Sequence, residues 1–232
     1  MTDAEGRPIQ PLGLGLKFSG ALELRRVIES ERFNLEETRR LRDRAGEKNA
    51  LSALALAFTE LGQTQRTIQY FQEELVIVRE AEDVEEECGL LASLGDAFAI
   101  SGNIEVAKKH YEEQLLRADA KGFRAFVGSA YNGLGYVFVK QDKIESAIEC
   151  YLKALVIYRE FENHDKELEL LVGIGLNYQK TGALEQAVEC YEQALQAAKY
   201  IESKKGRGAY PRGPDGTLLS SRQPEECSRS FE

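Results

Sequence analysis

A pattern that recurs every 40 residues limits the folds open to this 232-residue chain more than any other feature of its sequence. Four segments come into register at this interval: LSALALAFTELG (51–62), LASLGDAFAISG (91–102), YNGLGYVFVKQD (131–142) and LVGIGLNYQKTG (171–182). In each copy, apolar residues stand three and seven positions after the first residue, and a small residue stands four positions after it. These offsets lie on one face of an α-helix. The sequence therefore predicts four copies of a helix that packs through the same face.

A second helix is predicted after each of these copies. The first helix ends at Gly62, Gly102, Asp142 or Gly182, where glycine or aspartate tolerates a left-handed backbone conformation. Three apolar or small positions then recur at intervals of four residues: Thr67, Ala107, Ala147 and Ala187; Phe71, Tyr111, Tyr151 and Tyr191; Leu75, Leu115, Leu155 and Leu195. Each unit is thus a helical hairpin that cannot bury its apolar face alone, so the units are expected to stack as a solenoid.

These motifs resemble the tetratricopeptide repeat. The arrangement is Leu-x-x-Leu-Gly-x-x-Phe followed by Gly, then Ala-x-x-x-Tyr-x-x-x-Leu, and the best match in the chain is GALEQAVECYEQAL from Gly182. The 40-residue spacing resembles the Leu-Gly-Asn variety of the family, found in spindle-orientation and G-protein-signalling adaptors. The resemblance covers residues 50–200 and implies an all-α, right-handed superhelical solenoid of antiparallel helix pairs. Because the motif positions are packing positions, it implies no particular partner.

The repeat divides the chain into three parts. Residues 1–47 are interpreted as an eroded N-terminal capping repeat, of which about the first ten residues are expected to be disordered. Four repeats are predicted at 48–87, 88–127, 128–167 and 168–204. Residues 205–232, rich in Gly, Pro and Ser, are predicted to form a disordered tail.

The octapeptide GLGLKFSG (13–20) lies within the predicted capping repeat. It is not a phosphate-binding loop, because Ala21 and Leu22 stand where that loop requires Lys and Ser or Thr. Instead, Leu14, Gly15 and Phe18 occupy the repeat positions of a first helix. Residues 22–45 then have the pattern of a charged amphipathic helix, with Leu24, Val27, Ile28 and Leu35 on one side.

Residues typical of catalytic or metal sites form no recognisable pattern. His110 and His164 lack a patterned nucleophile or ligand partner and are expected to be surface or boundary residues. The cysteines contain no Cys-x-x-Cys pair and lack zinc-site spacings. The abundant carboxylates are interpreted as solvated partners of ion pairs. We therefore expect no enzymatic activity, no metal and no cofactor.

Charge and hydropathy exclude several classes of partner. A formal charge of -9 disfavours general binding to nucleic acid or anionic lipid. No stretch approaches the roughly 18 apolar residues of a membrane span, and the start MTDAEGRPIQ has no secretory signal. We expect a cytoplasmic protein, with the nucleus as the alternative.

The predicted partner-binding residues form a nearly uncharged stripe on the first helix of each hairpin. The family resemblance implies that this helix lines the inner curve, which would expose Asn49, Ser52, Leu56 and Thr59; Gly89, Ala92, Asp96 and Ala99; Ser129, Asn132, Tyr136 and Val139; and Glu169, Val172, Leu176 and Gln179. The candidate groove residues among them are Asn49, Ser52, Leu56, Asp96, Asn132, Tyr136, Val139, Val172, Leu176 and Gln179.

The composition of this stripe predicts the kind of partner. Asp96 and Tyr136 stand where asparagines of a chaperone-carboxylate clamp would help, so that ligand is not expected. The apolar members favour an extended peptide or an amphipathic helix, which makes the chain a protein-interaction adaptor. The alternative is a self-associating structural module whose groove is covered by its own tail or by a second copy.

Overall fold

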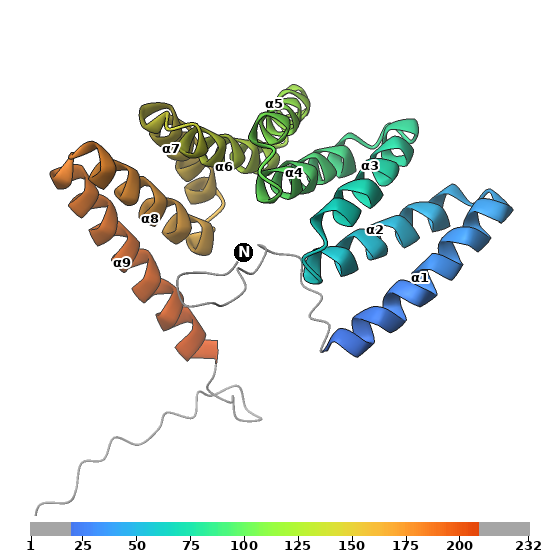
Figure 1. The fold of residues 1–232 in the computed structure, drawn as a ribbon. Helices are drawn as coiled ribbons and strands as arrows, with labels where there is room; N and C mark the ends of the chain where they lie inside the picture. Colours follow the sequence, from blue (N-terminus) through green and yellow to red (C-terminus); the bar gives the residue numbers. More distant parts are fainter. Residues whose placement is uncertain (1–19, 209–232) are drawn as a thin grey trace, which may run out of the picture. The chain divides into compact units, whose positions relative to one another are not determined.

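The computed structural model describes residues 20–208, which form nine α-helices packed in sequential antiparallel pairs (Figure 1). The helices are α1 (Ala21–Leu41), α2 (Arg44–Glu60), α3 (Thr64–Glu80), α4 (Val84–Ile100), α5 (Ile104–Lys121), α6 (Arg124–Lys140), α7 (Ile144–Glu160), α8 (His164–Thr181) and α9 (Leu184–Gly208). A first unit ends at Phe161 and holds α1 to α7, and a second begins at Glu162 and holds α8 and α9. The all-α array of helix pairs confirms the fold expected from the repeat.

The ends of the helices recur as regularly as the apolar pattern does. Positive φ angles fall at every twentieth residue from 42 to 182: at Arg42, Gly62, Glu82, Gly102, Gly122, Asp142, Glu162 and Gly182. The four predicted breaks are among them, and Asp142 adopts the left-handed conformation with a φ of 59°. Each helix and its connection therefore occupy half of the 40-residue repeat.

Side-chain caps explain where several first helices begin. Asp43 accepts a hydrogen bond from the backbone N–H of Gly46 (3.0 Å), and Asp83 accepts one from Glu86 (3.0 Å). In the second unit, Asn163 accepts one from Lys166 (3.1 Å). Each cap satisfies an N–H group that has no partner within its own helix, and this fixes the start of α2, α4 and α8.

The small residue of each first helix receives the aromatic ring of the second helix. A Cβ atom added at Gly95 would lie 2.5 Å from Cε1 of Tyr111, and one added at Gly135 would lie 2.5 Å from Cε1 of Tyr151. In the second unit, Tyr191 packs against Gly175 in the same way, at 2.7 Å. These glycines therefore allow the two helices of a hairpin to approach closely, as the repeat pattern predicts.

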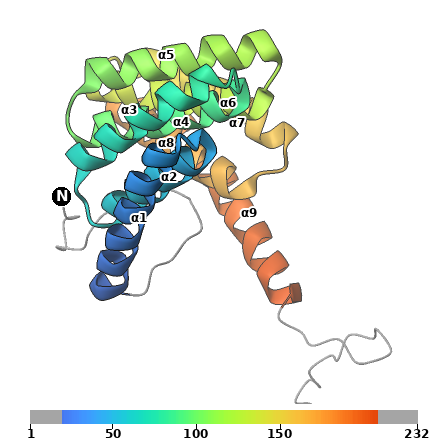
Figure 2. The same ribbon diagram turned by 90° about the vertical axis from the view of Figure 1, so that its right-hand side faces the viewer.

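In the first unit, α2, α4 and α6 lie along one side, and α3, α5 and α7 lie along the other (Figures 1 and 2). We call the side formed by α2, α4 and α6 the inner side. The second unit consists of α8 and α9, which pack side by side.

The amphipathic helix predicted at residues 22–45 is present as α1. Leu24, Ile28 and Leu35 are buried in a cluster with Leu51 and Leu54 of α2. The helix ends earlier than predicted, at Leu41, because the backbone turns left-handed at Arg42 and Asp43 caps the next helix.

The predicted repeat starts and the predicted tail start differ from the helix limits. The predicted repeat starts at 48, 88, 128 and 168 each fall four residues inside a first helix, since α2, α4, α6 and α8 begin at 44, 84, 124 and 164. Helix α9 continues to Gly208, beyond the predicted start of the tail at 205. The predicted disorder of the first residues and of 209–232, and the interpretation of GLGLKFSG before Gly20, lie outside the described residues.

Candidate partner-binding surface

The predicted stripe on α2, α4 and α6 is only partly exposed. Asn49, Asp96 and Tyr136 are exposed, whereas most other members are half-buried. Ala99 is an error of the prediction: it is 8% exposed and packs in a cluster with Ala107 and Tyr111. We define the inner stripe as the remaining members in the first unit: Asn49, Ser52, Leu56, Thr59, Gly89, Ala92, Asp96, Ser129, Asn132, Tyr136 and Val139.

Tyr136 is the most exposed large apolar side chain of the inner stripe. It is 38% exposed, while Asn132 and Val139, about one turn away on either side along α6, are half-buried. The Nζ atom of Lys140 lies 5.2 Å from the centroid of the Tyr136 ring, within the range of a cation–π contact. The inner stripe therefore carries an aromatic side chain on α6 with the cation of Lys140 beside it. Lys140 was not among the predicted stripe residues.

Asp96 is held by a residue from the second helix of its hairpin. The Oη atom of Tyr111 donates a hydrogen bond of 2.6 Å to Oδ1 of Asp96. The Tyr111 ring is buried between Gly95 of α4 and Gly133 of α6, where added Cβ atoms would lie 2.5 Å and 2.4 Å from its Cε1. Burial first, and then the charge and hydrogen bond of Asp96, raise the pKa of Tyr111. The stripe between α4 and α6 thus rests on a rigid, neutral tyrosine.

At α2, the stripe covers a buried carboxyl group that the sequence analysis missed. Glu74 of α3 is 4% exposed, and its Oε2 atom has no hydrogen-bond partner. Burial raises the pKa of Glu74 to about 7, and the charge of Glu86 adds to this, while a hydrogen bond with Ser52 and the charge of Lys48 oppose it. The unfolded chain releases this proton near pH 4.5, whereas the folded protein holds it up to about pH 7, so the free energy of unfolding falls as the pH rises between these two values.

Gln114 occupies the position of Glu74 in the next repeat and is fully buried. Neither its Oε1 nor its Nε2 atom has a hydrogen-bond partner. Ala92 stands 40 residues after Ser52 and has no hydroxyl group, so it cannot supply the bond that Glu74 receives. The sequence signal for both buried groups was their place directly before the recurring leucine of the second helix.

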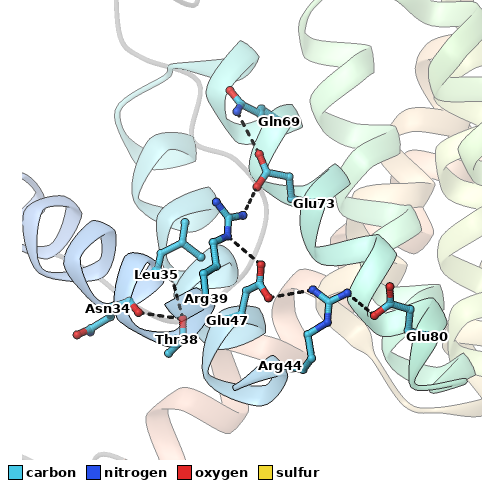
Figure 3. Close-up of polar contacts among 9 residues, drawn as sticks. All are labelled: Asn34, Leu35, Thr38, Arg39, Arg44, Glu47, Gln69, Glu73 and Glu80. Carbon is cyan, nitrogen blue, oxygen red and sulfur yellow. Dashed lines mark hydrogen bonds and ion pairs between the residues drawn. The ribbon is translucent and has the colours of Figure 1, made fainter. Parts of the chain in front are cut away.

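Other carboxylates are also more buried than predicted, and arginines hold them. Glu47 accepts hydrogen bonds from Arg39 (2.9 Å) and Arg44 (2.9 Å), and these arginines also reach Glu73 and Glu80 on α3 (Figure 3). Burial raises the pKa of Glu47, but the hydrogen bonds from the two arginines outweigh this and hold it below its usual range. These buried carboxylates join neighbouring helices and are ion-paired, so they are not free for acid–base chemistry.

The same arrangement recurs 40 residues later. Arg79 donates to Glu87 (2.7 Å) and to Glu113 (2.5 Å), and Arg117 lies 3.6 Å from Glu87. Glu87 is almost fully buried at the start of α4. The ion pairs thus belong to the repeat structure.

Neither histidine belongs to a cluster of metal ligands. His110 is half-buried and stacks on Phe98 at 5.3 Å, and burial lowers its pKa. His164 lies 3.0 Å from Glu167 and packs on Tyr200, both within the second unit. Within residues 20–208, no group of three or more His, Cys, Asp or Glu side chains is placed to hold a metal ion. No helix in the same range is long and apolar enough to cross a membrane.

The predicted site residues of the second unit lie on α8. Val172, Leu176 and Gln179 are all exposed. The Oη atom of Tyr191 donates a hydrogen bond of 3.3 Å to Oε1 of Gln179. The three residues form an apolar face with one amide, and we call it the α8 face.

Two segments of the sequence match a known class of helical repeat. Residues 126–199 and residues 50–85 each match a sequence profile of the tetratricopeptide repeat. These two segments therefore carry tetratricopeptide repeats. A search of curated protein sequences found no match.

Solved structures support the same fold. A signal transduction ATPase with a tetratricopeptide repeat sensor from Pyrococcus horikoshii is 21% identical with a TM-score of 0.70, over 77% of this chain and 28% of that chain. Aspartyl phosphate phosphatase F from Bacillus subtilis is 16% identical with a TM-score of 0.69, over 78% of this chain and 49% of that chain. Repeats of a putative kinesin light chain from Podosopora anserina are 17% identical with a TM-score of 0.64, over 78% of this chain and 89% of that chain. Identities this low show a shared fold alone.

Proposed function

We propose that this protein is a non-catalytic adaptor that binds a peptide or an amphipathic helix of another protein on the inner stripe. The observation that carries the proposal is Tyr136, an exposed aromatic ring on α6 with half-buried Asn132 and Val139 beside it. An aromatic anchor with an adjacent amide group suits the side chains and the backbone of a peptide at once. The α8 face is a second candidate contact, tested separately because it belongs to the second unit.

The rigid support of the stripe favours binding. Tyr111 fills the space between Gly95 and Gly133, and its hydroxyl group holds Asp96. A ligand that meets Tyr136 and Asp96 therefore meets side chains on helices whose packing is already set, and little conformational entropy is lost on binding.

The test compares a stripe variant with a matched variant away from the stripe. The variant Tyr136→Ala with Asn132→Ala should lose at least about tenfold in affinity for peptides selected on the wild-type protein from a random library, since truncating a binding hot spot costs about 2 kcal/mol. The control is Leu116→Ala on α5, which removes an exposed apolar side chain outside the stripe and should leave affinity unchanged. Fluorescence anisotropy measures the affinity, and thermal unfolding checks that all variants fold.

Three results would count against the proposal. Unchanged affinity in the stripe variant would place binding elsewhere, and Val172→Ala with Leu176→Ala would then test the α8 face. Loss of affinity together with a large fall in Tm would mean that the substitutions act through folding. Failure of the wild-type protein to select any peptide also counts against it.

One observation favours a second candidate function, a self-associating structural module. On α9, Val188 and Leu195 are 54% and 55% exposed, whereas Ile68 and Leu75, at the same repeat positions on α3, are 5% and 7% exposed. In α3 these positions pack against α4, so α9 presents the apolar face that another helix covers in the first unit. Light scattering tests this function: a mass that rises with concentration, and no longer does so in Val188→Lys with Leu195→Lys, would support it.

A further inference from the structure

An open hollow of about 350 Å³ lies between α1 and α2 on the first unit. It is lined by Glu31, Asn34, Glu37 and Thr38 from α1 and by Gly46, Asn49, Ala50 and Ala53 from α2. Among residues 20–208, no helix covers this surface in the way that the rest of the array covers equivalent positions.

The repeat shows what occupies the equivalent surface elsewhere. Helices α1 and α2 correspond to α5 and α6, which stand 80 residues later in the chain. In the same order, the residues equivalent to the lining of the hollow are Tyr111, Gln114, Arg117, Ala118, Phe126, Ser129, Ala130 and Gly133. Helix α4 packs against both α5 and α6.

Contacts of α4 with these residues are direct. The ring of Tyr111 fits against Gly95, and Ala118 shares an apolar cluster with Cys88. Gln114, at the position of Asn34, is fully buried, whereas Asn34 itself is exposed. The hollow is therefore the place that a first helix takes in a complete repeat.

We propose that residues 12–19 of this chain occupy the hollow in the place that α4 takes over α5 and α6. Subtracting 80 from the positions of α4 gives residues 4–20, which directly precede α1 in the chain. The connection is short, since Gly20 caps α1 and has a φ of 113°, a backbone conformation in which glycine lets the chain change direction.

The side chains of the segment match those that α4 supplies. Leu14, Gly15 and Phe18 stand 80 residues before Leu94, Gly95 and Phe98. Leu94 and Gly95 are buried in the array, and Phe98 is half-buried. Pro8 and Pro11 exclude a helix through the whole of residues 4–20, which is why the proposal is confined to the part after them.

Charge favours the same occupant. Lys17 is the only charged residue between Pro8 and Gly20, and the hollow presents the carboxylates of Glu31 and Glu37. Glu31 accepts a hydrogen bond from Asn34 at 3.2 Å, and Glu37 pairs with Arg40 at 2.7 Å. Both partners are exposed, so these carboxylates keep room to meet a lysine.

The hydroxyl group on the lining is already engaged, which leaves shape and charge as the basis of recognition. The Oγ1 atom of Thr38 donates to the backbone oxygens of Asn34 (2.9 Å) and Leu35 (3.1 Å) within α1 (Figure 3). The methyl group of Thr38, at the position of Ala118 in the later repeat, lies beside Gly46 of α2. Indeed, a Cβ atom added at Gly46 would lie 2.6 Å from that methyl carbon.

Occupation of the hollow also limits the proposed partner site. Asn49 belongs both to the lining of the hollow and to the inner stripe. A docked segment would cover Asn49, so the stripe open to a partner would begin at Ser52. The inference is independent of the adaptor function, because the segment can dock whether or not a partner binds.

Thiol labelling tests the proposal on the full chain. Ala53→Cys places a thiol in the hollow, and Cys227→Ser removes the cysteine outside the described residues, while Cys88, Cys150 and Cys190 are buried. Deleting residues 1–19 should speed modification of the new thiol at least about tenfold, because protection ends when the covering segment is gone. Leu14→Asp with Phe18→Asp in the full chain should speed it similarly.

A matched control and two contrary outcomes complete the test. Ser93→Cys places a thiol at the equivalent half-buried position of α4, and its labelling rate should not respond to the deletion. Equal rates at Ala53→Cys with and without residues 1–19, and with the two aspartates, would overturn the proposal. Protection that grows with protein concentration would also overturn it, since the occupant would then be a second copy. If the deletion lowers helix content, the aspartate variant decides.

Discussion

Replacing Gly135 with alanine probes the contact on which each hairpin depends. The added Cβ atom would lie 2.5, 2.6 and 2.9 Å from three ring atoms of Tyr151, whereas carbon atoms pack best at about 3.5–4.0 Å. The ring is buried, so it cannot swing into solvent. Relief requires the two helices, α6 and α7, to move apart.

Two opposing effects set the magnitude. Alanine is favoured over glycine by about 1 kcal/mol inside a helix. Overpacking a well-packed contact costs about 1–3 kcal/mol, and an overlap with three ring atoms falls at the upper end. We therefore expect Gly135→Ala to lower the free energy of unfolding by about 2 kcal/mol.

Urea denaturation followed by circular dichroism measures this change, and Gly89→Ala is the matched control. Gly89 also lies inside a helix of the first unit, but a Cβ atom there would meet its nearest neighbour, Cε1 of Phe126, at an ordinary 3.7 Å. Gly89→Ala should therefore raise stability by up to about 1 kcal/mol. In a Tyr151→Ala background, Gly135→Ala should become stabilising as well, because its obstacle is gone. If Gly135→Ala stabilises the wild-type protein as Gly89→Ala does, the reasoning is refuted.

Three further predictions concern charge. The free energy of unfolding should fall by up to about 3 kcal/mol as the pH rises from about 4.5 to about 7, because the folded protein keeps the Glu74 proton that the unfolded chain loses. Urea titrations at several pH values measure this fall, and Glu74→Gln should remove it. An equal fall in Glu74→Gln would show that Glu74 is not responsible. Arg79→Met should lower the free energy of unfolding by about 1–3 kcal/mol, because buried Glu87 loses its nearest cation. Arg40→Met removes the exposed ion pair with Glu37 and should cost under about 1 kcal/mol. Equal shifts in Tm for the two variants would contradict this prediction. Raising the salt concentration from about 50 to 200 mM should leave most of the peptide affinity of the inner stripe intact, since the anchor at Tyr136 is largely apolar. If anisotropy titrations show that the affinity falls by orders of magnitude, binding lies on a charged surface.

The apolar periodicity made the helices predictable, because the same offsets carry the packing face in every copy. The close fit of Gly135 against Tyr151 followed from it, since both residues recur at fixed places in each hairpin. The limits of the helices and of the tail were harder to predict. Helix α9 runs through Gly206 and ends at Gly208, because a glycine after a helical pattern favours an end without fixing its position.

The candidate site was less predictable than the fold. Ala99 fits the helical spacing of the stripe, yet it is buried, because the end of α4 packs against the start of α5. The carboxylate of Glu47 depends on arginines from α1 and α2, whose meeting requires the angle between helices as well as the periodicity of each. Partner binding on the stripe and on the α8 face stays a prediction.

The polar links between hairpins connect residues that are near in sequence, and this bears on how the chain acquires its structure. Arg39 reaches Glu73, Lys48 reaches Glu86, and Arg79 reaches Glu113, at separations of 34, 38 and 34 residues. Little loop-closure entropy opposes such contacts, so topology favours rapid folding. On the ribosome, each hairpin of the first unit could therefore pack on the one before it as soon as about 40 more residues have emerged, without waiting for the C-terminal part of the chain.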